Sequence, residues 1–156
     1  MQPTLLEYTG THTHTKTETQ LFVYDNLELT ECEDFEVDAL ASNVDWSRIN
    51  WLNVHGLNSV ATIQKIGAFL SVDNFMMADI LNTTKRTKLD EYHEVLFFSI
   101  KSLLPVEHSD NITVEQISFL LKKNILVSFQ EKRSDFFSHL RERLRTHSGI
   151  VREKGA

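Results

Sequence analysis

Asp79 is the first candidate for chemistry, because it interrupts an apolar segment. It lies in NFMMADIL, residues 74–81, and a cationic segment with Lys85, Arg86 and Lys88 follows directly. A carboxylate in this setting can act as a general acid or base, bind a divalent cation, or pair with a nearby ammonium group. The residues alone favour the third interpretation, a surface carboxylate paired with Lys85 or Arg86, and they leave the other two open.

His12 and His14 form a second candidate, for a transition metal. They lie in TGTHTHTKTETQ, residues 9–20, where Thr alternates with other residues in the period of two that is typical of a strand. On a strand these two side chains would share one face about 6.6 Å apart, which is a workable spacing for two imidazole ligands. Two imidazoles are too few, so such a site needs a third ligand from elsewhere. We expect most of the other histidines to be solvated or to cap elements.

The sequence signatures of common enzymes are missing. The chain contains no GxGxxG, GxxxxGK[ST], GxSxG or HExxH, so nucleotide binding and common hydrolase chemistry have no motif behind them. The single cysteine, Cys32, lies beside Glu31, Glu33 and Asp34, whose charges would raise a thiol pKa, the opposite of what a nucleophile needs. We therefore expect a protein that is not an enzyme.

Length and charge limit the remaining classes. The 156 residues, 41% of them hydrophobic, suffice for one domain with a core. The net charge of −6 argues against general nucleic-acid binding, which depends on Lys and Arg. Residues 132–156 hold seven bases and three acids, which indicates either an acidic partner or a solvated helix face. No apolar run approaches the roughly 18–20 residues of a membrane helix, so we expect a soluble chain.

The periodicity of the sequence predicts strands and helices that alternate only in part. In the first half we expect an edge strand or a strand-like arm over 9–25, a second strand after a turn at Asp25-Asn26, and a short helix within 34–42. A strand over 49–57 follows, then a helix over 60–70 capped by Asn58 or Ser59, and a short helix capped by Ser71 or Asp73 that ends near Asn82.

In the second half, residues 91–104 are apolar on both faces and predict a central strand that is buried on both sides and ends at Pro105. A hairpin around Lys122-Lys123-Asn124 comes next. A last helix is expected from a cap at Ser134 to a stop at Gly149, with Phe136, Phe137, Leu140 and Leu144 as its buried stripe. A three-layer sandwich of helices, a mixed sheet and helices accommodates these elements.

The order of several segments resembles the amino-terminal cytoplasmic domain of the CorA family of divalent-cation transporters. The matching stretches run from one end of the chain to the other: LLEYTG, FVYDN, INWLNVHGL, IQKIGAFL, MADILNTTKRTKLDEYHEVLFF, EQISFLLKKNILVSFQEK and FFSHLRERLRTHSGIVREKGA. Their shared order and spacing carry the resemblance more than any one stretch does.

The resemblance implies an α/β fold, a three-layer α/β/α sandwich with a mixed sheet, as a single domain over residues 1–156. It also implies a fragment, because members of the family continue after the segment matching REKGA into a stalk helix and two membrane helices with a Gly-Met-Asn signature. The implied assembly is a homopentamer that is attached to the cell membrane through this missing region. Its domains lie on the cytoplasmic face.

For Asp79, the resemblance implies a ligand of a regulatory ion that binds between subunits and favours the closed pore. The ion would be Mg²⁺, or alternatively Co²⁺ or another divalent cation. Family members often have an acidic pair here, and Ala78 replaces the first acid in this chain. Mg²⁺ keeps several waters and needs only one or two carboxylates, so Asp79 stays a candidate. We expect no other cofactor, no nucleic acid and no small-molecule substrate in this domain.

The function expected from the resemblance is that of a cytoplasmic, Mg²⁺-sensing regulatory domain of a transporter for Mg²⁺ or Co²⁺. One alternative is the soluble domain of the related ZntB-type zinc transporters, which share the fold. Another is a free-standing metal-binding or interaction module that has kept the fold without a channel. The full reading frame separates the last from the other two, because only a transporter continues into two apolar runs of about 20 residues.

Overall fold

The computed structural model describes residues 6–106, 108–133 and 135–154. Within them the strands are β1 Glu18–Tyr24, β2 Leu29–Glu33, β3 Ile49–His55, β4 Lys88–Tyr92, β5 Val95–Pro105, β6 Ile112–Lys122 and β7 Ile125–Gln130. The α-helices are α1 Leu40–Asn43, α2 Val60–Leu70, α3 Asn74–Leu81 and α4 Ser138–Thr146. Two 3₁₀ turns, η1 Val37–Ala39 and η2 Asp135–Phe137, precede α1 and α4.

The strands form one mixed sheet of order β2-β1-β3-β7-β6-β5-β4. Strands β3 and β7 run parallel, with Leu52 opposite Val127, and the other neighbouring pairs are antiparallel. The predicted hairpin is confirmed as β6–β7, and the turn residue Lys123 has a φ of 51°. The parallel pair lies at the centre, where both faces of the sheet are covered.

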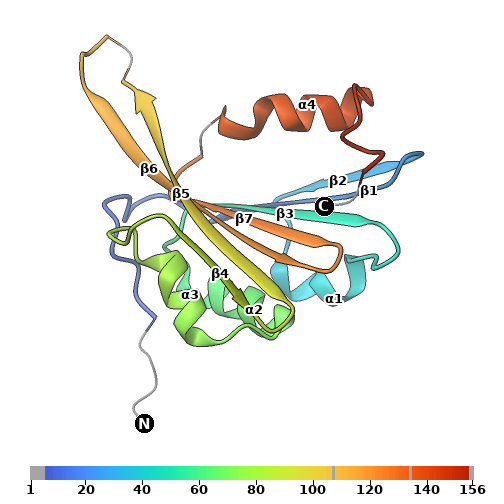
Figure 1. Cartoon of the computed structure of the whole chain (residues 1–156), viewed down its shortest axis with the longest axis horizontal. Helices are drawn as coiled ribbons and strands as arrows, with labels where there is room; N and C mark the ends of the chain where they lie inside the picture. The colour runs from blue at the N-terminus through green and yellow to red at the C-terminus, as the bar shows by residue number, and fades with distance from the viewer. Residues whose placement is uncertain (1–5, 107, 134, 155–156) are drawn as a thin grey trace.

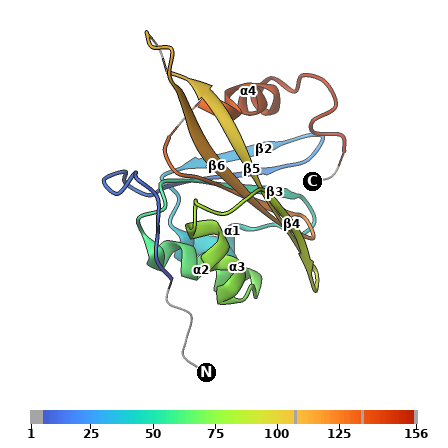
Figure 2. The same cartoon turned by 60° about the vertical axis from the view of Figure 1, so that its left-hand side comes forward.

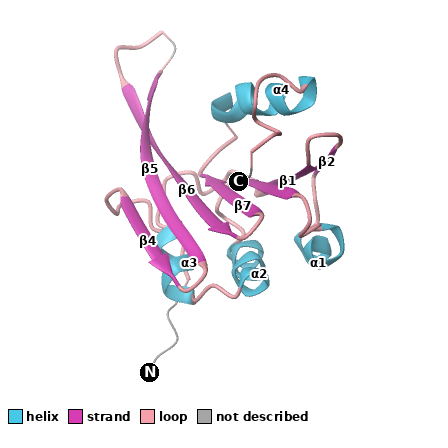
Figure 3. Ribbon diagram, turned by 45° about the vertical axis from the view of Figure 1, so that its right-hand side comes forward, coloured by secondary structure: helices cyan, strands magenta, loops and turns pink. Residues whose placement is uncertain are grey.

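Helices cover both faces of the sheet, which confirms the predicted three-layer α/β/α sandwich. Figures 1 and 3 show α1, α2 and α3 on one side of the sheet and α4 on the other. The larger core lies on the side of α1, α2 and α3 and includes buried Leu52, Ile63, Met77 and Val127. A smaller cluster lies beneath α4 and contains Phe22, Tyr24, Trp51 and Leu144.

Helices α2 and α3 begin where the sequence predicts. Ser59 Oγ accepts a hydrogen bond from the Thr62 amide at 3.3 Å, and Asp73 Oδ1 accepts one from the Met76 amide at 2.9 Å. Both side chains satisfy amides that the first helical turn leaves without a backbone partner. In α2, Ile63, Ile66, Gly67 and Leu70 are buried and form one face of the helix.

The amino-terminal prediction is wrong in two respects. Residues 6–17 contain no strand, and β1 begins only at Glu18. The chain in this region instead makes turns and irregular contacts, such as the hydrogen bond of 2.8 Å from Asn58 Nδ2 to the His12 carbonyl. In addition, β1 is not an edge strand, because β2 pairs with its outer side.

The single central strand expected over 91–104 is also wrong. The segment divides into β4 and β5, and these strands lie at and next to an edge of the sheet. Burial of β5 is one-sided, since Val95, Phe97 and Ser99 are buried whereas the residues between them are half-buried. The end of the strand at Pro105 is confirmed. Beyond Ser99 the β5–β6 hairpin projects past its neighbours, as Figure 2 shows.

The last helix is shorter than expected. It covers Ser138–Thr146 and ends at His147, which has a left-handed φ of 55°, two residues before Gly149. The expected cap, Ser134, lies outside the described residues. Of the predicted stripe, Leu144 is buried and Phe137 and Leu140 are half-buried, whereas Phe136 is exposed.

Candidate functional site

Helix α3 places Asp79 at the border between core and surface. Met76, Met77, Ile80 and Leu81 of this helix are buried, because the other side chains of the core close over them. Asp79 lies on the flank of the same short helix, and only 9% of its surface is exposed. A carboxylate at this depth needs partners, since an isolated charge loses much of its hydration there.

The partners of Asp79 are two lysines from the segment that follows α3. Lys85 Nζ donates to Asp79 Oδ1, and Lys88 Nζ donates to Asp79 Oδ2 at 2.7 Å. Lys88 Nζ also lies 2.6 Å from Asp90 Oδ2. The predicted pairing with Lys85 is therefore confirmed. The alternative pairing with Arg86 is wrong, because Arg86 is exposed and forms no ion pair with any described residue.

The two lysines keep Asp79 ionised. Burial acts to raise the pKa of the Asp79 carboxyl, but the hydrogen bonds and charges of Lys85 and Lys88 outweigh it and hold the pKa below its ordinary value. The same contacts raise the pKa of Lys88. Asp79 therefore carries a full negative charge at neutral pH, which is the form that binds a cation.

A surface cavity of about 320 Å³ opens beside this carboxylate, between α3 and β4. Its other acids are Asp73, Asp90 and Glu91, and its apolar walls include Phe75, which is 65% exposed. Four carboxylates and one lysine line the cavity, so its lining attracts cations. Among the described residues, however, no group of three or more His, Cys, Asp or Glu side chains is arranged to hold a metal ion.

The carboxylates that line the cavity are hard oxygen donors of the kind that Mg²⁺ accepts. Asp79 supplies one hard carboxylate oxygen donor, and Mg²⁺ retains waters and accepts one or two carboxylates. An ion that binds Asp79 meets two ammonium groups already in contact with the carboxylate, one on each oxygen.

The two-histidine hypothesis loses its structural basis. His12 and His14 lie in the irregular segment before β1, where the Thr15 amide donates to the His12 carbonyl at 3.3 Å. They do not share the face of a strand, so the spacing argument for a metal site does not apply. His12 is half-buried and His14 is exposed.

Sequence reasoning missed a buried polar row on the side of the sheet that faces α4. Trp51 Nε1 donates to Ser128 Oγ at 2.9 Å, Ser128 donates to Asn53 Oδ1 at 2.8 Å, and Asn53 Nδ2 lies 3.0 Å from His55 Nε2. Burial, followed by the charges of Arg141 and Arg133, lowers the pKa of His55. His55 is therefore a neutral member of the core and not a solvated histidine.

A second missed feature is a pair of buried acids, Glu115 in the first half of β6 and Glu131 directly after β7. Glu131 Oε1 accepts a hydrogen bond from Tyr8 Oη at 3.0 Å, and Glu131 Oε2 accepts one from the Gln116 amide at 3.1 Å. Glu115 Oε1 accepts one from the Lys132 amide at 3.4 Å. The available signal was weak, because neither acid belongs to a catalytic or metal-binding motif, although both lie in the stretch EQISFLLKKNILVSFQEK.

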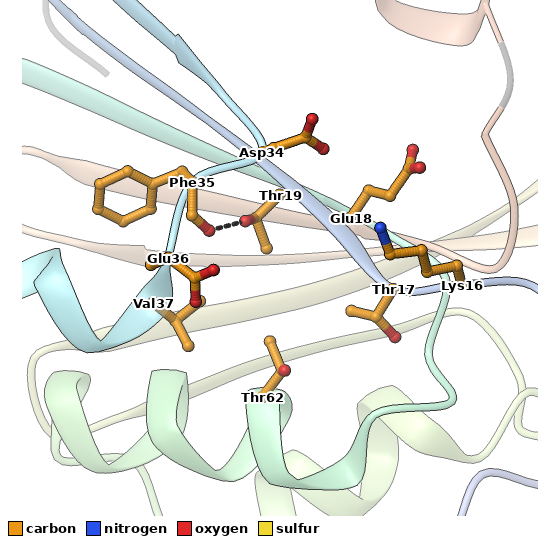
Figure 4. A pocket seen from close by; sticks show the side chains of 9 residues that line it. All are labelled: Lys16, Thr17, Glu18, Thr19, Asp34, Phe35, Glu36, Val37 and Thr62. Carbon is orange, nitrogen blue, oxygen red and sulfur yellow. Dashed lines mark hydrogen bonds between the residues drawn. The ribbon is translucent and has the colours of Figure 1, made fainter.

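A further pocket of about 160 Å³ lies between the start of β1, the segment after β2 and the start of α2 (Figure 4). Its lining residues are Lys16, Thr17, Glu18, Thr19, Asp34, Phe35, Glu36, Val37 and Thr62. The hydroxyl of Thr19 donates to the Phe35 carbonyl, which ties the pocket wall to β1. The lining contains no histidine or cysteine, and it offers no nucleophile with an adjacent base.

The basic carboxyl-terminal segment makes contacts inside the domain. Arg145 Nε donates to Glu31 Oε2 of β2 at 2.8 Å, and Arg152 Nε donates to the Leu144 carbonyl at 2.7 Å. Part of the charge asymmetry therefore serves to hold α4 against the sheet. No helix among the described residues has the length and apolar character to cross a membrane.

Several solved structures share this fold. The full-length CmaX protein aligns with a TM-score of 0.69 at 12% identity, over 90% of this chain and 42% of that one. The CorA magnesium transporter of Methanocaldococcus jannaschii aligns with a TM-score of 0.63 at 14% identity, over 88% of this chain and 40% of that one. The ZntB cytoplasmic domain of Vibrio parahaemolyticus aligns with a TM-score of 0.60 at 13% identity, over 86% of this chain and 52% of that one. At these identities the likeness establishes the fold alone.

Sequence comparison goes further. The cobalt/magnesium transport protein CorA of Thermotoga maritima is 30% identical to this chain over all 156 residues, and the chain spans 44% of the length of that relative. The family model described as CorA-like Mg2+ transporter protein matches residues 46–155, a range that includes Asp79, Lys85 and Lys88. The chain therefore belongs to the CorA-like Mg²⁺ transporter family.

Proposed function

We propose that the chain is the cytoplasmic regulatory domain of a transporter for Mg²⁺, with Co²⁺ as a further substrate. Family membership supports this assignment, as does the curated relative, whose name specifies cobalt and magnesium transport. The parent protein forms a homopentamer that is anchored in the membrane by a region outside this chain. The domain lies at the cytoplasmic face of that membrane.

The observation that carries the regulatory role is the ionised, nearly buried carboxylate of Asp79 beside a surface cavity with three further acids. No group of three His, Cys, Asp or Glu side chains among the described residues is arranged to hold a metal ion, so we place a second carboxylate ligand on the neighbouring chain. In the pentamer, Asp79 of one subunit and an acid of its neighbour would hold the ion together. Such a shared site stabilises only the arrangement that brings the two chains together, so ion binding shifts the population toward it.

Closure of the pore follows from this population shift. Cytoplasmic Mg²⁺ favours the symmetric ring with the domains together, and low Mg²⁺ lets the domains move apart. The transporter would thereby reduce uptake when the cytoplasm is replete. Asp79 is the residue of this chain that links the ion to the arrangement of the domains.

Limited proteolysis of the full-length protein tests the proposal. MgCl₂ is expected to protect the wild type, and Asp79→Ala is expected to abolish this protection. Asp110→Ala removes an equal charge from an exposed loop and serves as the control that keeps the protection. Equal protection of the wild type and Asp79→Ala would remove Asp79 from the mechanism, and a reading frame without membrane helices would overturn the transporter assignment.

The zinc-transporting relatives define the second outcome of the same experiment. The ZntB domain and the CorA transporter have nearly equal structural likeness to this chain, so the fold does not separate the two ions. Repeating the digestion with ZnCl₂ and CoCl₂ compares the ions directly. Protection at lower concentrations of Zn²⁺ than of Mg²⁺ or Co²⁺ would favour the zinc assignment.

A further inference from the structure

Lys85 and Lys88 each contact a different oxygen of Asp79. The carboxylate therefore has both of its oxygens engaged before any ion arrives. A cation that binds Asp79 has to compete with two ammonium groups of the same chain. These contacts are internal to the domain, so the competition exists in every subunit.

The two lysine side chains are more exposed than that of Asp79, so separation of an ion pair moves a lysine into water and leaves Asp79 in place. The side chains of Lys85 and Lys88 are 49% and 39% exposed, whereas that of Asp79 is 10% exposed. Lys85 can turn into water. Lys88 already contacts Asp90 at 2.6 Å, so it keeps a carboxylate partner after it releases Asp79.

We propose that Lys85 and Lys88 determine the ion specificity and the threshold of the Asp79 site by occupying it in the ion-free state. This inference rests on the proposed function. A monovalent cation brings no more charge to the carboxylate than the lysine that it displaces, whereas a divalent cation brings twice as much. The lysines therefore keep K⁺ and Na⁺ out and set the Mg²⁺ concentration at which the site fills.

The experiment measures the MgCl₂ concentration that gives half-maximal protease protection of the full-length protein. Lys85→Met and Lys88→Met are each expected to lower this midpoint about fivefold, the effect of a partly exposed ion pair at the upper end of its usual strength. Arg86→Met is the matched control, because it removes the same charge from the same segment without touching Asp79. Its midpoint should stay near that of the wild type.

A second pair of variants reverses the expected direction. Asp90→Asn removes the alternative partner of Lys88, so Lys88 stays on Asp79 and the midpoint rises. Glu91→Gln removes the same charge from the same cavity without a contact to Lys88. If the MgCl₂ midpoint rises more in Asp90→Asn than in Glu91→Gln, the difference isolates the role of Lys88. In both variants the two lysines and their ion pairs with Asp79 are still present.

Specificity provides an independent readout. High KCl should weaken Mg²⁺ protection more in the Lys85→Met/Lys88→Met double variant than in the wild type, because K⁺ then reaches Asp79. Urea unfolding in EDTA confirms that each variant is folded. If the lysine variants match Arg86→Met while Asp79→Ala abolishes protection, the lysine inference is overturned and the proposed function stands. If Asp79→Ala responds like the wild type, both are overturned.

Discussion

Tyr8 donates a hydrogen bond of 3.0 Å to Glu131, 123 residues further along the chain. Tyr8 Oη also accepts one from the His12 amide at 3.3 Å, so one phenol joins the amino-terminal segment to the end of β7. Burial, followed by the nearby charge of Glu131, raises the pKa of the Tyr8 phenol, so it remains a donor. This contact orders a segment whose sequence pattern suggests a strand but whose structure contains none.

Tyr8→Phe is expected to lower the free energy of unfolding by about 1 kcal/mol, because it leaves Glu131 Oε1 and the His12 amide without this partner. Amide hydrogen exchange should increase in residues 9–17 more than in the sheet. The control is Tyr92→Phe, which removes a hydroxyl from a tyrosine that is 48% exposed. Equal exchange in both variants would show that the phenol does not hold the segment.

The buried carboxyl of Glu115 is expected to make the free energy of unfolding depend on pH. Burial is the main cause that raises the pKa of its carboxyl above the ordinary value of 4.5, and the charge of Glu131 adds to it, while Lys132 and His12 act in the opposite direction. Its Oε2 atom has no hydrogen-bond partner among the described residues. Because the folded state holds this proton more tightly than the unfolded state, stability falls as the pH rises from 4.5 through the raised pKa.

Glu115→Gln removes this titration. Its stability relative to that of the wild type should therefore increase as the pH rises from 4.5 toward neutrality and level off above the raised pKa. Urea unfolding at a series of pH values measures the difference. Glu153→Gln, which replaces the same type of side chain at an exposed position, is the control. A flat difference for Glu115→Gln would mean that Glu115 ionises in the folded protein as it does in the unfolded chain.

Apolar periodicity predicted four parts of the fold near their observed positions. Strand β3, helices α2 and α3, and the β6–β7 hairpin all appear near their expected positions. Strand β4 was missed because KLDEY carries charges and has no buried residue in the sheet. The burial of β5 was misjudged because an apolar pattern does not show which layer of the fold covers each face of an edge-proximal strand.

At the candidate site, the residue types in the sequence identified Asp79 correctly. Closeness in sequence suggested Lys85 or Arg86 as its partner, whereas the second partner in the structure is Lys88. The pairing of β4 with β5 sets Lys88 opposite Ser99, and alternation then puts Lys88, Asp90 and Tyr92 on the same face as α3. Arg86 is closer to Asp79 in sequence than Lys88 is, but it lies outside β4 and forms no ion pair with Asp79. Without the strand, nothing in the sequence distinguishes the two cations.

At Gly56, directly after β3, the backbone conformation and a close neighbour leave no room for a side chain. Its φ is +79°, its amide donates to the Gln130 carbonyl at 2.8 Å, and a Cβ would lie 2.5 Å from the Lys16 carbonyl oxygen. Gly56→Ala should therefore lower the free energy of unfolding by about 3 kcal/mol. Gly149 has a φ of +70° with no atom near its Cβ position, so Gly149→Ala should cost about 1 kcal/mol. Equal costs would show that the contact with Lys16 relaxes freely.

The side chain of Leu144 attaches helix α4 to the sheet. It is fully buried against Phe22, Tyr24 and Trp51, and the ring of Trp51 stacks on Phe22 with centroids 4.8 Å apart. Leu144→Ala should lower the free energy of unfolding by about 3 kcal/mol, because it leaves a cavity beneath the helix.

Loosening of α4 should also increase the quenching of Trp51 fluorescence by a soluble quencher, measured in a Trp46→Phe background so that Trp51 alone is observed. Ile150→Ala, at a residue that is 58% exposed, is the control and should change neither stability nor quenching. A loss of stability in Leu144→Ala without increased quenching would mean that the cavity collapses while α4 stays in place. In that case Arg145 and its ion pair with Glu31 would hold the helix against β2.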